Sequence, residues 1–487
     1  MKIISGSDCH DGSLCLLKNG KVEMHVTAER INHLKHSNVC SDSMKYFGED
    51  EKDLQYTKLE DSHHIFHAAH SFYDSGFYEA ICVVIDGMGS NVPLSEPLFE
   101  KGSQGRESIS VYRIEYPCKI ELIYSEIVTP FKCNIFYDIF RITSTCSPAL
   151  MFQKTCESIG MKWYDAGKLM AMASYGKDVI DIKDEWFDGN DLRNIKLNKK
   201  LETFEDQCDF AKSLQVKSQE RVKDIILKMV EKTGCKNVCM SGGYFLNCVS
   251  NTFVQKHLPK DVNTFIEPIC GDDGISIGLA KLNYYSKILS RRKFPLKDIY
   301  FGKKQKINIK GNKVSPKDVA KLLSDGNVVG IFQSRSESGP RALGNRSLLY
   351  DPRDPNGRDK INKLKGRENY RPLAATVLQE HAHKWFDMCG LEESPYMLYT
   401  LDVLSDKVPA VNHVDNTCRV QTLKKNFNKH YYNLIKEFYK ITDVPMLLNT
   451  SFNLAGDTIV ETVDDALNTL RNSEIDYIYF PETSTLI

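Results

Sequence analysis

The amino-acid sequence predicts a mixed α/β protein with a duplicated N-terminal domain and a second α/β domain at its C-terminus. Glycine-tipped strand patterns recur through the first part of the chain. A basic stretch with little apolar periodicity follows between residues 280 and 313, and another set of strands and helices lies beyond it. We therefore expect domains at residues 1–310 and 311–487.

The glycine-tipped strands share one arrangement. The chain opens as strand, polar turn and strand, and an Asn19-Gly20 hairpin signal precedes a third strand. Later apolar strands end in Asp86-Gly87 and in Gly242-Gly243. Actin-like ATPase folds resemble this layout, because their strand-tip turns contact phosphates and metal and a Gly-Gly turn holds adenosine. The pattern predicts a duplicated actin-like ATPase fold, and ordinary polar turns are the alternative.

The composition excludes several classes of protein. The chain has 64 Lys plus Arg and 64 Asp plus Glu, so no net charge steers it toward nucleic acid or an anionic membrane. No apolar run approaches the roughly 18 residues of a membrane span, and the N-terminus turns polar too soon for a signal peptide. The 15 cysteines are scattered without a CxxC pair, which predicts reduced, mostly buried thiols in the cytosol.

A histidine cluster is the first candidate metal site. His63, His67 and His70 follow one another at spacings of four and three, which places them on one face of a helix. Two such imidazoles suit one metal ion, and the further ligand is most often a carboxylate. Asp272, in the turn GDDG, is the candidate carboxylate. The alternatives are a solvated histidine face and an aspartate that caps a helix.

A run of arginines and glycines is the most distinctive feature of the second domain. Arg335, Arg341 and Arg346 alternate with glycines over residues 335–347, and guanidinium groups beside bare amides suit bidentate phosphate binding. A solvated loop is the alternative. Further basic and polar residues add to the same predicted pocket: Lys365, Arg367, Arg371, His413, Asp415, Arg419, Asn449, Thr450, Ser451 and Asn453.

Together these motifs resemble the NodU/CmcH family of O-carbamoyltransferases, which includes enzymes that carbamoylate tobramycin-type antibiotics. The resemblance covers almost the whole chain, and GPRALGNRS followed at a distance by LLNTSFN is its most specific part. The stretches CHDGSLCLLKNGKV, TAERINHLKH, HHIFHAAHSFYDSGF and GDDGISIG match as well. The resemblance implies a first domain similar to the TsaD proteins of tRNA threonylcarbamoylation and a second domain similar to YrdC.

The resemblance implies chemistry in two stages. Carbamoyl phosphate and ATP form carbamoyl-adenylate in the second domain, and an acceptor hydroxyl then attacks its carbonyl carbon in the first domain, where AMP leaves. The implied cofactors are ATP as co-substrate, Mg²⁺ with ATP, and Fe²⁺ or another divalent metal. The implied acceptor is a small-molecule alcohol, such as an aminoglycoside, nodulation oligosaccharide or cephem; 5-hydroxymethylcytosine in DNA is a further hypothesis, and a homodimer stays open.

The resemblance also assigns roles to residues. His10 would help to remove the acceptor's proton, with Asp11 beside it, and an unperturbed imidazole pKa of about 6.5 suits this task. His63, His67 and Asp272 match the family's metal ligands. The remaining predicted catalytic residues are Lys365, Arg419 and Ser451. The predicted cofactor-binding residues are Gly12, Ser13, Asp86, Gly87, Gly242, Gly243, Asn247, Arg335, Arg341, Asn345, Arg346, Arg371, His413, Asn449 and Thr450.

Three other functions stay open at this point. A TsaD-like tRNA threonylcarbamoyl enzyme would depend on threonine and tRNA. An actin-fold sugar kinase would convert ATP to ADP and leave His63 and His67 as helix surface. A non-catalytic binding module would leave the arginines without an anion. Departures from the family pattern, such as Tyr244 in SGGYFLN, concern the acceptor pocket and oligomer contacts.

Overall fold

The chain forms two compact units in the computed structural model, which describes residues 1–39, 41–48, 54–58, 62–94, 99–100, 102–189, 194–288 and 292–487. Unit 1 comprises Met1–Glu23 and Glu49–Lys297, and unit 2 comprises Met24–Gly48 and Asp298–Ile487. The predicted mixed α/β class is confirmed. The chain divides after Lys297 rather than at residue 310, and Met24–Gly48 packs with the second unit; the roles of the two domains stay predictions.

The first sheet contains the predicted opening hairpins. Its strand order is β3-β2-β1-β4, with β1 antiparallel to β2 and parallel to β4. Asn19 and Gly20 have φ values of 50° and 82°, as the predicted hairpin turn requires. The strands are β1 (Lys2–Asp8), β2 (Ser13–Lys18), β3 (Lys21–Thr27) and β4 (Leu54–Lys58).

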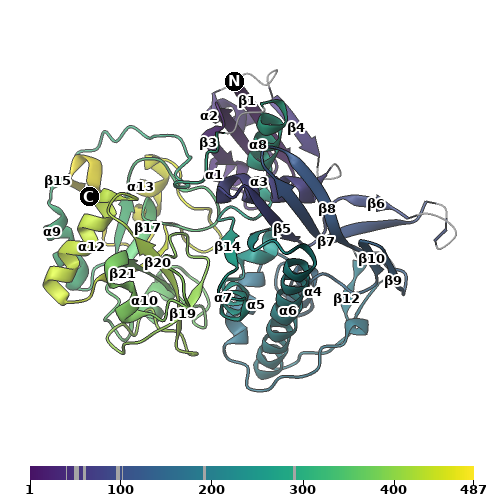
Figure 1. Ribbon diagram of the computed structural model, residues 1–487. Helices are drawn as coiled ribbons and strands as arrows, with labels where there is room; N and C mark the ends of the chain where they lie inside the picture. The colour runs from purple at the N-terminus through teal and green to yellow at the C-terminus, as the bar shows by residue number, and fades with distance from the viewer. Residues whose placement is uncertain are drawn as a thin grey trace. The chain divides into compact units, whose positions relative to one another are not determined.

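A second sheet in unit 1 repeats this pattern (Figure 1). Its order is β14-β13-β5-β7-β8-β10-β9, and β6 pairs with β7. β5 is antiparallel to β7 and parallel to β13, as β1 is to β2 and β4. This repeat is the duplicated layout predicted for an actin-like ATPase fold. The strands are β5 (Glu79–Ile85), β6 (Asn91–Pro93), β7 (Gln104–Glu115), β8 (Lys119–Val128), β9 (Asn134–Tyr137), β10 (Phe140–Thr143), β13 (Asn237–Ser241) and β14 (Asn263–Ile266).

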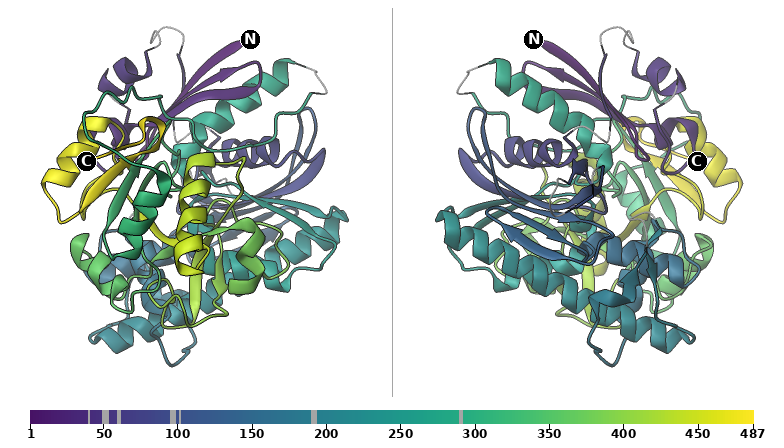
Figure 2. Two further views of the ribbon diagram at one scale, coloured as in Figure 1. Left: turned by 90° about the vertical axis from the view of Figure 1, so that its left-hand side faces the viewer. Right: turned by 90° about the vertical axis from the view of Figure 1, so that its right-hand side faces the viewer.

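Helices α3 (His63–Ser75) and α8 (Ile275–Lys287) pack between the two sheets of unit 1 (Figures 1 and 2). α8 lies on β1 and β2, α3 lies on β5 and β13, and the helices contact each other. A Cβ atom on Gly278 would lie 2.1 Å from the Phe66 carbonyl oxygen, so this close approach requires glycine. The other elements are α4 (Pro148–Ser158), α5 (Ala166–Ala173), α6 (Phe204–Thr233), α7 (Cys248–His257), β11 (Phe187–Asp188) and β12 (Lys196–Leu197).

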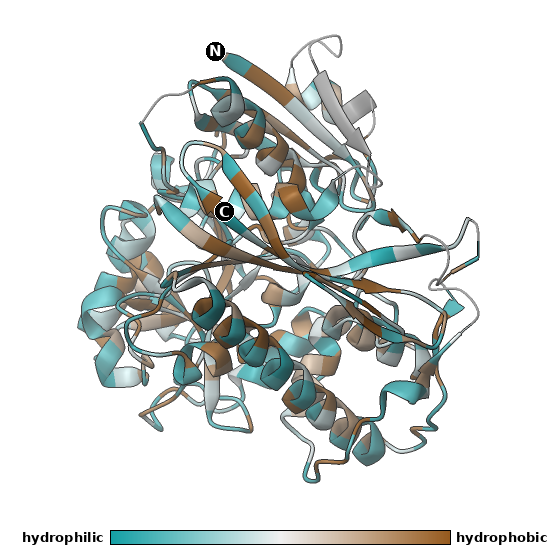
Figure 3. Ribbon diagram, turned by 45° about the vertical axis from the view of Figure 1, so that its right-hand side comes forward, coloured by the Kyte–Doolittle hydropathy of each residue, from teal (hydrophilic) through white to brown (hydrophobic). Residues whose placement is uncertain are grey.

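The pattern of hydrophobic residues explains which elements of unit 1 are fully buried and which are partly exposed. The central strand β5 is buried almost throughout, whereas the 30-residue helix α6 alternates buried and exposed positions and carries a Thr203 capping box at its start. Figure 3 shows hydrophilic and hydrophobic residues, in teal and brown, alternating along the helices. None of the helices in the described ranges is long and apolar enough to cross a membrane.

A buried charge cluster ties α3 to α8. His70, Asp74, Glu267 and Lys281 are each at most 3% exposed. His70 Nε2 lies 3.1 Å from Asp74 Oδ2 and 3.4 Å from Glu267 Oε1, and the Lys281 ammonium donates to Asp74. Burial, together with the charge of Asp74, holds the pKa of Glu267 well above its ordinary value, which favours the neutral carboxyl. Asp74 and Lys281 form the ion pair of this cluster.

Replacing Lys281 with methionine should destabilise the protein by about 3 to 5 kcal/mol, because the Asp74 carboxylate would stay buried without its cation. Urea unfolding followed by circular dichroism measures this loss. The double variant Asp74→Asn/Lys281→Met removes both charges and should recover most of the stability. A single variant that unfolds at the wild-type urea concentration would contradict this account.

Unit 2 is built on one mixed sheet of order β15-β23-β22-β16-β17-β21-β18-β20-β19. Phe332, Phe452 and Phe480 pack in its core. The strands and helices expected beyond residue 313 are present. The elements are β15 (Asn312–Lys313), α9 (Pro316–Ser324), β16 (Val329–Phe332), β17 (Arg346–Tyr350), α10 (Gly357–Leu364), β18 (Ala374–Leu378), α11 (Ala382–Trp385), β19 (Thr400–Asp402), β20 (Thr417–Leu423), α12 (Lys429–Thr442), β21 (Met446–Ser451), α13 (Val463–Arg471), β22 (Tyr477–Phe480) and β23 (Thr485–Leu486).

The segment Met24–Gly48, which carries α1 (Ala28–Asn32) and α2 (Ser41–Phe47), belongs to unit 2 through specific contacts. His25 Nδ1 lies 2.9 Å from Ser338 Oγ, and Arg30 Nη2 donates to the Gly339 carbonyl at 3.2 Å. Tyr46 donates its hydroxyl to Glu461 at 2.7 Å. This segment therefore supports the loop that contains GPRALGNRS.

Candidate functional site

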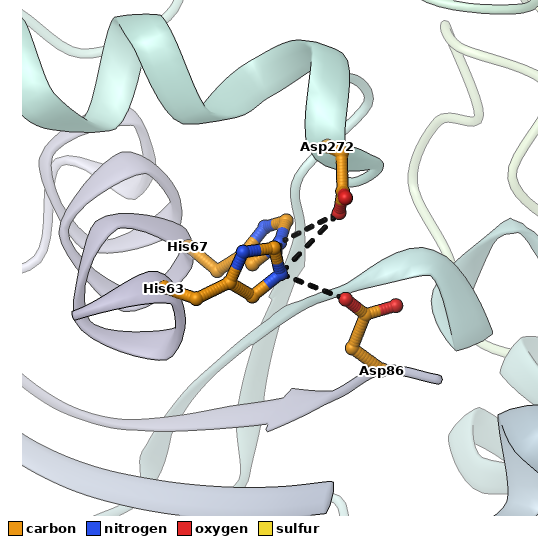
Figure 4. Close-up of side chains that lie close together, drawn as sticks. All are labelled: His63, His67, Asp86 and Asp272. Atoms are coloured by element: carbon orange, nitrogen blue, oxygen red, sulfur yellow. Dashed lines mark hydrogen bonds and ion pairs between the residues drawn. The ribbon is translucent and has the colours of Figure 1, made fainter. Parts of the chain in front are cut away.

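Four side chains converge in unit 1 (Figure 4). His63 Nε2 lies 2.8 Å from Asp86 Oδ2 and 3.4 Å from Asp272 Oδ1, and His67 Nε2 lies 3.4 Å from the same Asp272 oxygen. The two Nε2 atoms are 3.3 Å apart. The structure thus brings together the three predicted ligands and adds Asp86, which the sequence had suggested for cofactor binding.

The local fold explains this convergence. His63 and His67 lie one turn apart on α3, Asp86 directly follows β5, and Asp272 lies at the turn between β14 and α8. Because β5, β13 and β14 are parallel, their carboxyl ends share one edge of the sheet. Ser241, at the end of β13, places its Oγ 3.4 Å from His67 Nδ1, where it orients the ring.

The charges at this cluster favour a cation. Burial favours a neutral imidazole, but the charges and hydrogen bonds of Asp272 and Asp86 outweigh it and raise the pKa of His63 to about 10. Burial opposes ionisation of Asp272, yet the charge of His63 holds its pKa well below the ordinary value. Two imidazole nitrogens that face one another beside two carboxylates fit a divalent metal, with His and Asp as ligands. Iron is compatible with this ligand set.

His10 borders the metal cluster. Its Nδ1 lies 3.6 Å from Asp272 Oδ2, its Nε2 lies 3.2 Å from Asp11 Oδ2, and its side chain is 41% exposed. Burial lowers the pKa of His10, but the hydrogen bond that the ring donates to Asp11 and the charge of Asp272 raise it to about 9. The edge of the ring meets Trp163, with centroids 4.9 Å apart. An exposed imidazole beside the cluster suits proton transfer with a bound molecule.

The residues predicted to bind the nucleotide in unit 1 have different structural roles. Gly242 has φ 97°, and a Cβ atom there would lie 2.2 Å from the Ile85 carbonyl oxygen, so the turn needs glycine. Asn247 caps α7 by accepting from the Ser250 amide at 3.1 Å. Ser13 Oγ is buried 2.7 Å from Ser276 Oγ. Gly12 directly precedes β2, Gly87 follows Asp86 after β5, and Gly243 begins a 3-10 helix (Gly243–Leu246).

A cationic cluster lies in unit 2 around Lys365. The Lys365 side chain is 4% exposed and donates to Ser451 Oγ at 3.2 Å and Asn453 Oδ1 at 2.9 Å. Burial first, and then the charges of Arg367, Arg371 and Lys35, hold the pKa of Lys365 well below its ordinary value. Within the described ranges, none of the acidic side chains pairs with Lys365.

The surroundings of Lys365 reinforce this positive field. Burial and the charges of Arg371 and Arg419 lower the pKa of Arg367 to about 9. A cavity of about 510 Å³ reaches the cluster at Arg367 and is lined by Lys360 and Lys363 as well. Sequence reasoning missed Lys35, although TAERINHLKH had matched the family, and it placed Arg367 in the predicted pocket. Such a field suits phosphate oxygens.

The arginine-rich loop of unit 2 is held by side chains of its own. Glu337 Oε1 accepts from the amides of Leu343 and Asn345 at 2.6 and 2.8 Å. Arg346 is fully buried, stacks on Phe332 and donates to the Gln333 carbonyl at 2.7 Å. The structure thus shows Arg346 supporting the loop, and its role in ligand binding stays a prediction.

Some of the other predicted binding residues of unit 2 also support the fold, whereas others are partly buried side chains. Asn449 Nδ2 donates to Thr376 Oγ1 at 2.9 Å, and Asn345 Nδ2 donates to the Arg335 carbonyl at 2.7 Å, so both amides hold the fold. Arg335, Arg341 and Arg419 are half-buried, and His413 is 7% exposed. Thr450 lies beside Ser451 on β21.

Comparisons with known proteins identify the family. Residues 43–281 match the carbamoyltransferase N-terminus model and residues 320–485 match the carbamoyltransferase C-terminus model. The chain belongs to the carbamoyltransferase family. The nodulation protein NolNO of Sinorhizobium fredii is 29% identical, over 96% of this chain and 77% of that protein. The nodulation protein NolO of Bradyrhizobium diazoefficiens is 30% identical, over 85% of this chain and 77% of that protein.

The family sets the general reaction of this carbamoyltransferase, which moves a carbamoyl group from a donor to an acceptor. An uncharacterized protein of Synechocystis sp. is 31% identical, over 86% of this chain and 75% of that protein. The crystal structure of T. kodakarensis HypF has a TM-score of 0.39 and 13% identity, over 59% of this chain and 48% of that one. A likeness this remote carries no argument here.

Metal content tests the cluster in this carbamoyltransferase. His67→Ala should lower bound metal from about one ion per chain to below about a tenth, because one imidazole ligand is lost. Mass spectrometry of protein purified without oxygen from iron-supplied cells measures the content. His64→Gln is the matched control, since His64 lies on the same helix and faces Ser110 at 2.7 Å instead. Equal loss in both variants would count against the assignment.

Proposed function

We propose that the chain is an ATP-dependent O-carbamoyltransferase that works through carbamoyl-adenylate. In the first stage carbamoyl phosphate, ATP and water give carbamoyl-adenylate, phosphate and pyrophosphate. In the second stage an acceptor hydroxyl oxygen attacks the carbamoyl carbon, the bond from that carbon to the AMP phosphate oxygen breaks, and AMP leaves. The observation that carries this proposal is the buried ammonium of Lys365 among arginines, which lacks a carboxylate partner in the described part of unit 2.

The first stage suits the cationic cluster of unit 2. Carbamoyl phosphate and the ATP triphosphate repel each other, and Lys365, Arg371 and Arg419 would offset that repulsion at the distance that adenylation needs. Burial and the neighbouring charges lower the pKa of Lys365, and a bound anion would raise it again by stabilising the ammonium. Ser451 already contacts the Lys365 ammonium and lies at the end of β21.

The second stage suits unit 1. A divalent metal held by His63, His67, Asp86 and Asp272 would supply Lewis-acid polarisation of a phosphoryl or carbonyl oxygen. His10 would receive the acceptor's proton on a ring nitrogen, because its side chain is partly exposed and borders Asp272. The charge of Asp11 would stabilise the imidazolium that results.

Separating the stages tests the proposal. Lys365→Ala should lower pyrophosphate release by at least about 100-fold, because the buried cation at the phosphates is lost, yet it should transfer carbamoyl from supplied carbamoyl-adenylate at the wild-type rate. Radiolabelled carbamoyl phosphate and chemically prepared carbamoyl-adenylate provide the two measurements. Lys317→Ala, an exposed lysine on helix α9 outside the cavity that Arg367 lines, is the control. Failure of supplied adenylate to rescue Lys365→Ala would mean that the stages are not separable.

The pH profile tests the role of His10. Transfer from supplied carbamoyl-adenylate needs a neutral imidazole, so its rate should rise with pH up to the pKa of His10, which Asp11 and Asp272 raise. Asp11→Asn removes one of these charges and should move the rising limb to lower pH. His10→Ala should be slow and nearly independent of pH. An unshifted limb in Asp11→Asn would exclude His10 as the titrating base.

Other readings of the site predict different products. A sugar kinase would release ADP, whereas adenylation releases AMP and pyrophosphate. A tRNA threonylcarbamoyl enzyme would depend on threonine and tRNA instead of carbamoyl phosphate. The buried cationic cluster and the family signature GPRALGNRS favour carbamoyl-adenylate over both. Mg²⁺ with ATP, iron as the metal, a homodimer and a cytosolic location stay predictions.

A further inference from the structure

Ser90 and Glu107 connect the segments that carry two ligands of the metal cluster. Asp86 and His63, which face each other in this cluster (Figure 4), come from the loop after β5 and from the first residue of α3. Ser90 lies at the far end of that loop, and its hydroxyl accepts a hydrogen bond from the His63 backbone amide at 2.9 Å. The loop that carries one ligand therefore also binds the helix that carries another.

The bond from His63 to Ser90 takes the place of an ordinary helix cap. The first amides of a helix lack partners within the helix, and the side chain of the preceding residue usually accepts from one of them. Ser62 precedes α3, and in the part of the chain that the structure describes its side chain makes no such bond. Ser90, which is 7% exposed, supplies the acceptor from a later loop instead. This fixes the start of α3, and with it His63, relative to Asp86.

Glu107 on β7 holds Ser90 in turn. Its Oε2 accepts from the Ser90 amide at 3.1 Å, its own amide donates to the Ser90 carbonyl at 3.0 Å, and its carbonyl accepts from the Gly89 amide at 2.8 Å. β7 has an irregular register against β8 between Glu107 and Ile109, as in a β-bulge. Bulges are common beside functional sites, because they redirect a strand and its side chains. These bonds leave Ser90 little freedom to move.

The loop also packs closely on α3. A Cβ atom on Gly89 would lie 2.6 Å from His64 Nε2, so a larger residue would collide with this buried ring. At the start of the loop, the Asp86 amide donates to the Ser108 carbonyl on β7 at 3.3 Å. Both ends of the loop are therefore tied to β7, and its position sets the distance of 2.8 Å between Asp86 Oδ2 and His63 Nε2.

We propose that Ser90 and Glu107 are positioning residues of the metal cluster. Glu107 fixes Ser90, and Ser90 fixes the separation between His63 and Asp86. Neither residue belongs to the group of four side chains that could hold the ion. Removing a hydrogen-bond partner behind the ligands commonly lowers metal affinity about 10- to 100-fold. The inference rests on the proposed function, because that function assigns a divalent metal to these ligands.

Titration of the metal-free full chain with Co²⁺, followed by its visible absorption bands, tests this inference. Ser90→Ala should weaken Co²⁺ binding at least about tenfold and change the bands, because His63 and Asp86 lose their fixed separation. Glu107→Ala should do the same. Glu107→Gln keeps an acceptor for the Ser90 amide and should stay within about threefold of the wild-type affinity. The double variant Ser90→Ala/Glu107→Ala should bind within about twofold of the weaker single variant, since both residues act through one contact.

Two control variants remove comparable groups elsewhere in unit 1. Thr203→Ala deletes the side-chain cap of α6, and Glu115→Gln neutralises a partly exposed carboxylate at the other end of β7. Both should keep Co²⁺ affinity within about twofold, although the first also removes a helix cap. A loss in Thr203→Ala equal to that in Ser90→Ala would overturn the inference, because it would show a general effect of stability. Equal losses in Glu107→Gln and Glu107→Ala, or losses that multiply in the double variant, would overturn it as well.

The outcomes separate this inference from the function on which it rests. Pyrophosphate release belongs to the proposed stage in unit 2, so Ser90→Ala should release it from carbamoyl phosphate and ATP at the wild-type rate. Weaker Co²⁺ binding in the variants of a chain that releases no pyrophosphate would support the positioning role and reject the first stage. Unchanged Co²⁺ affinity and bands in Ser90→Ala, in a chain that does release pyrophosphate, would reject the positioning role alone. Failure of the wild-type chain to bind Co²⁺ would overturn the metal assignment and this inference with it.

Discussion

Two imidazoles and two carboxylates share one buried volume in unit 1, and the surrounding structure depends on neutralising them. The two carboxylates outweigh the effect of burial and raise the pKa of His63 to about 10. Without another cation, they therefore keep this imidazole protonated. The ligands come from α3, the end of β5 and the turn before α8, so these segments must hold a fixed separation. The backbone contact at Gly278 and the charge cluster around Asp74 supply that separation. A metal centre of this kind is a property of the packing between the sheets.

The zero net charge of the chain conceals two opposite local fields. Unit 1 gathers carboxylates in the metal cluster at the carboxyl edge of its second sheet. Unit 2 buries Lys365 beside Arg367 without a compensating carboxylate in its described residues. Each field suits one class of ligand, a divalent cation in unit 1 and phosphate groups in unit 2. Composition alone could not reveal this, because the two fields cancel in the sum.

Sequence periodicity predicted the parts of the fold that depend on local spacing. The pairing of His63 with His67 follows from helical geometry, and the hairpin at Asn19 follows from turn chemistry. Asp86 was assigned to cofactor binding because a strand-terminal aspartate looks the same whether it contacts a nucleotide or a metal. Arg346 and Asn449 carry family motifs and also support the fold, and motif positions do not distinguish a side chain that binds a ligand from one that supports the backbone. These distinctions depend on contacts between distant segments.

The placement of Met24–Gly48 has a consequence for how the protein is made and dissected. This segment leaves the ribosome early, but its partners Ser338, Gly339 and Glu461 are synthesised near the end of the chain. Unit 2 can therefore complete its packing only after translation is almost finished. A fragment that starts at Asp298 lacks the contacts of His25, Arg30 and Tyr46, so expressing this half alone calls for co-expression of the early segment as a separate peptide.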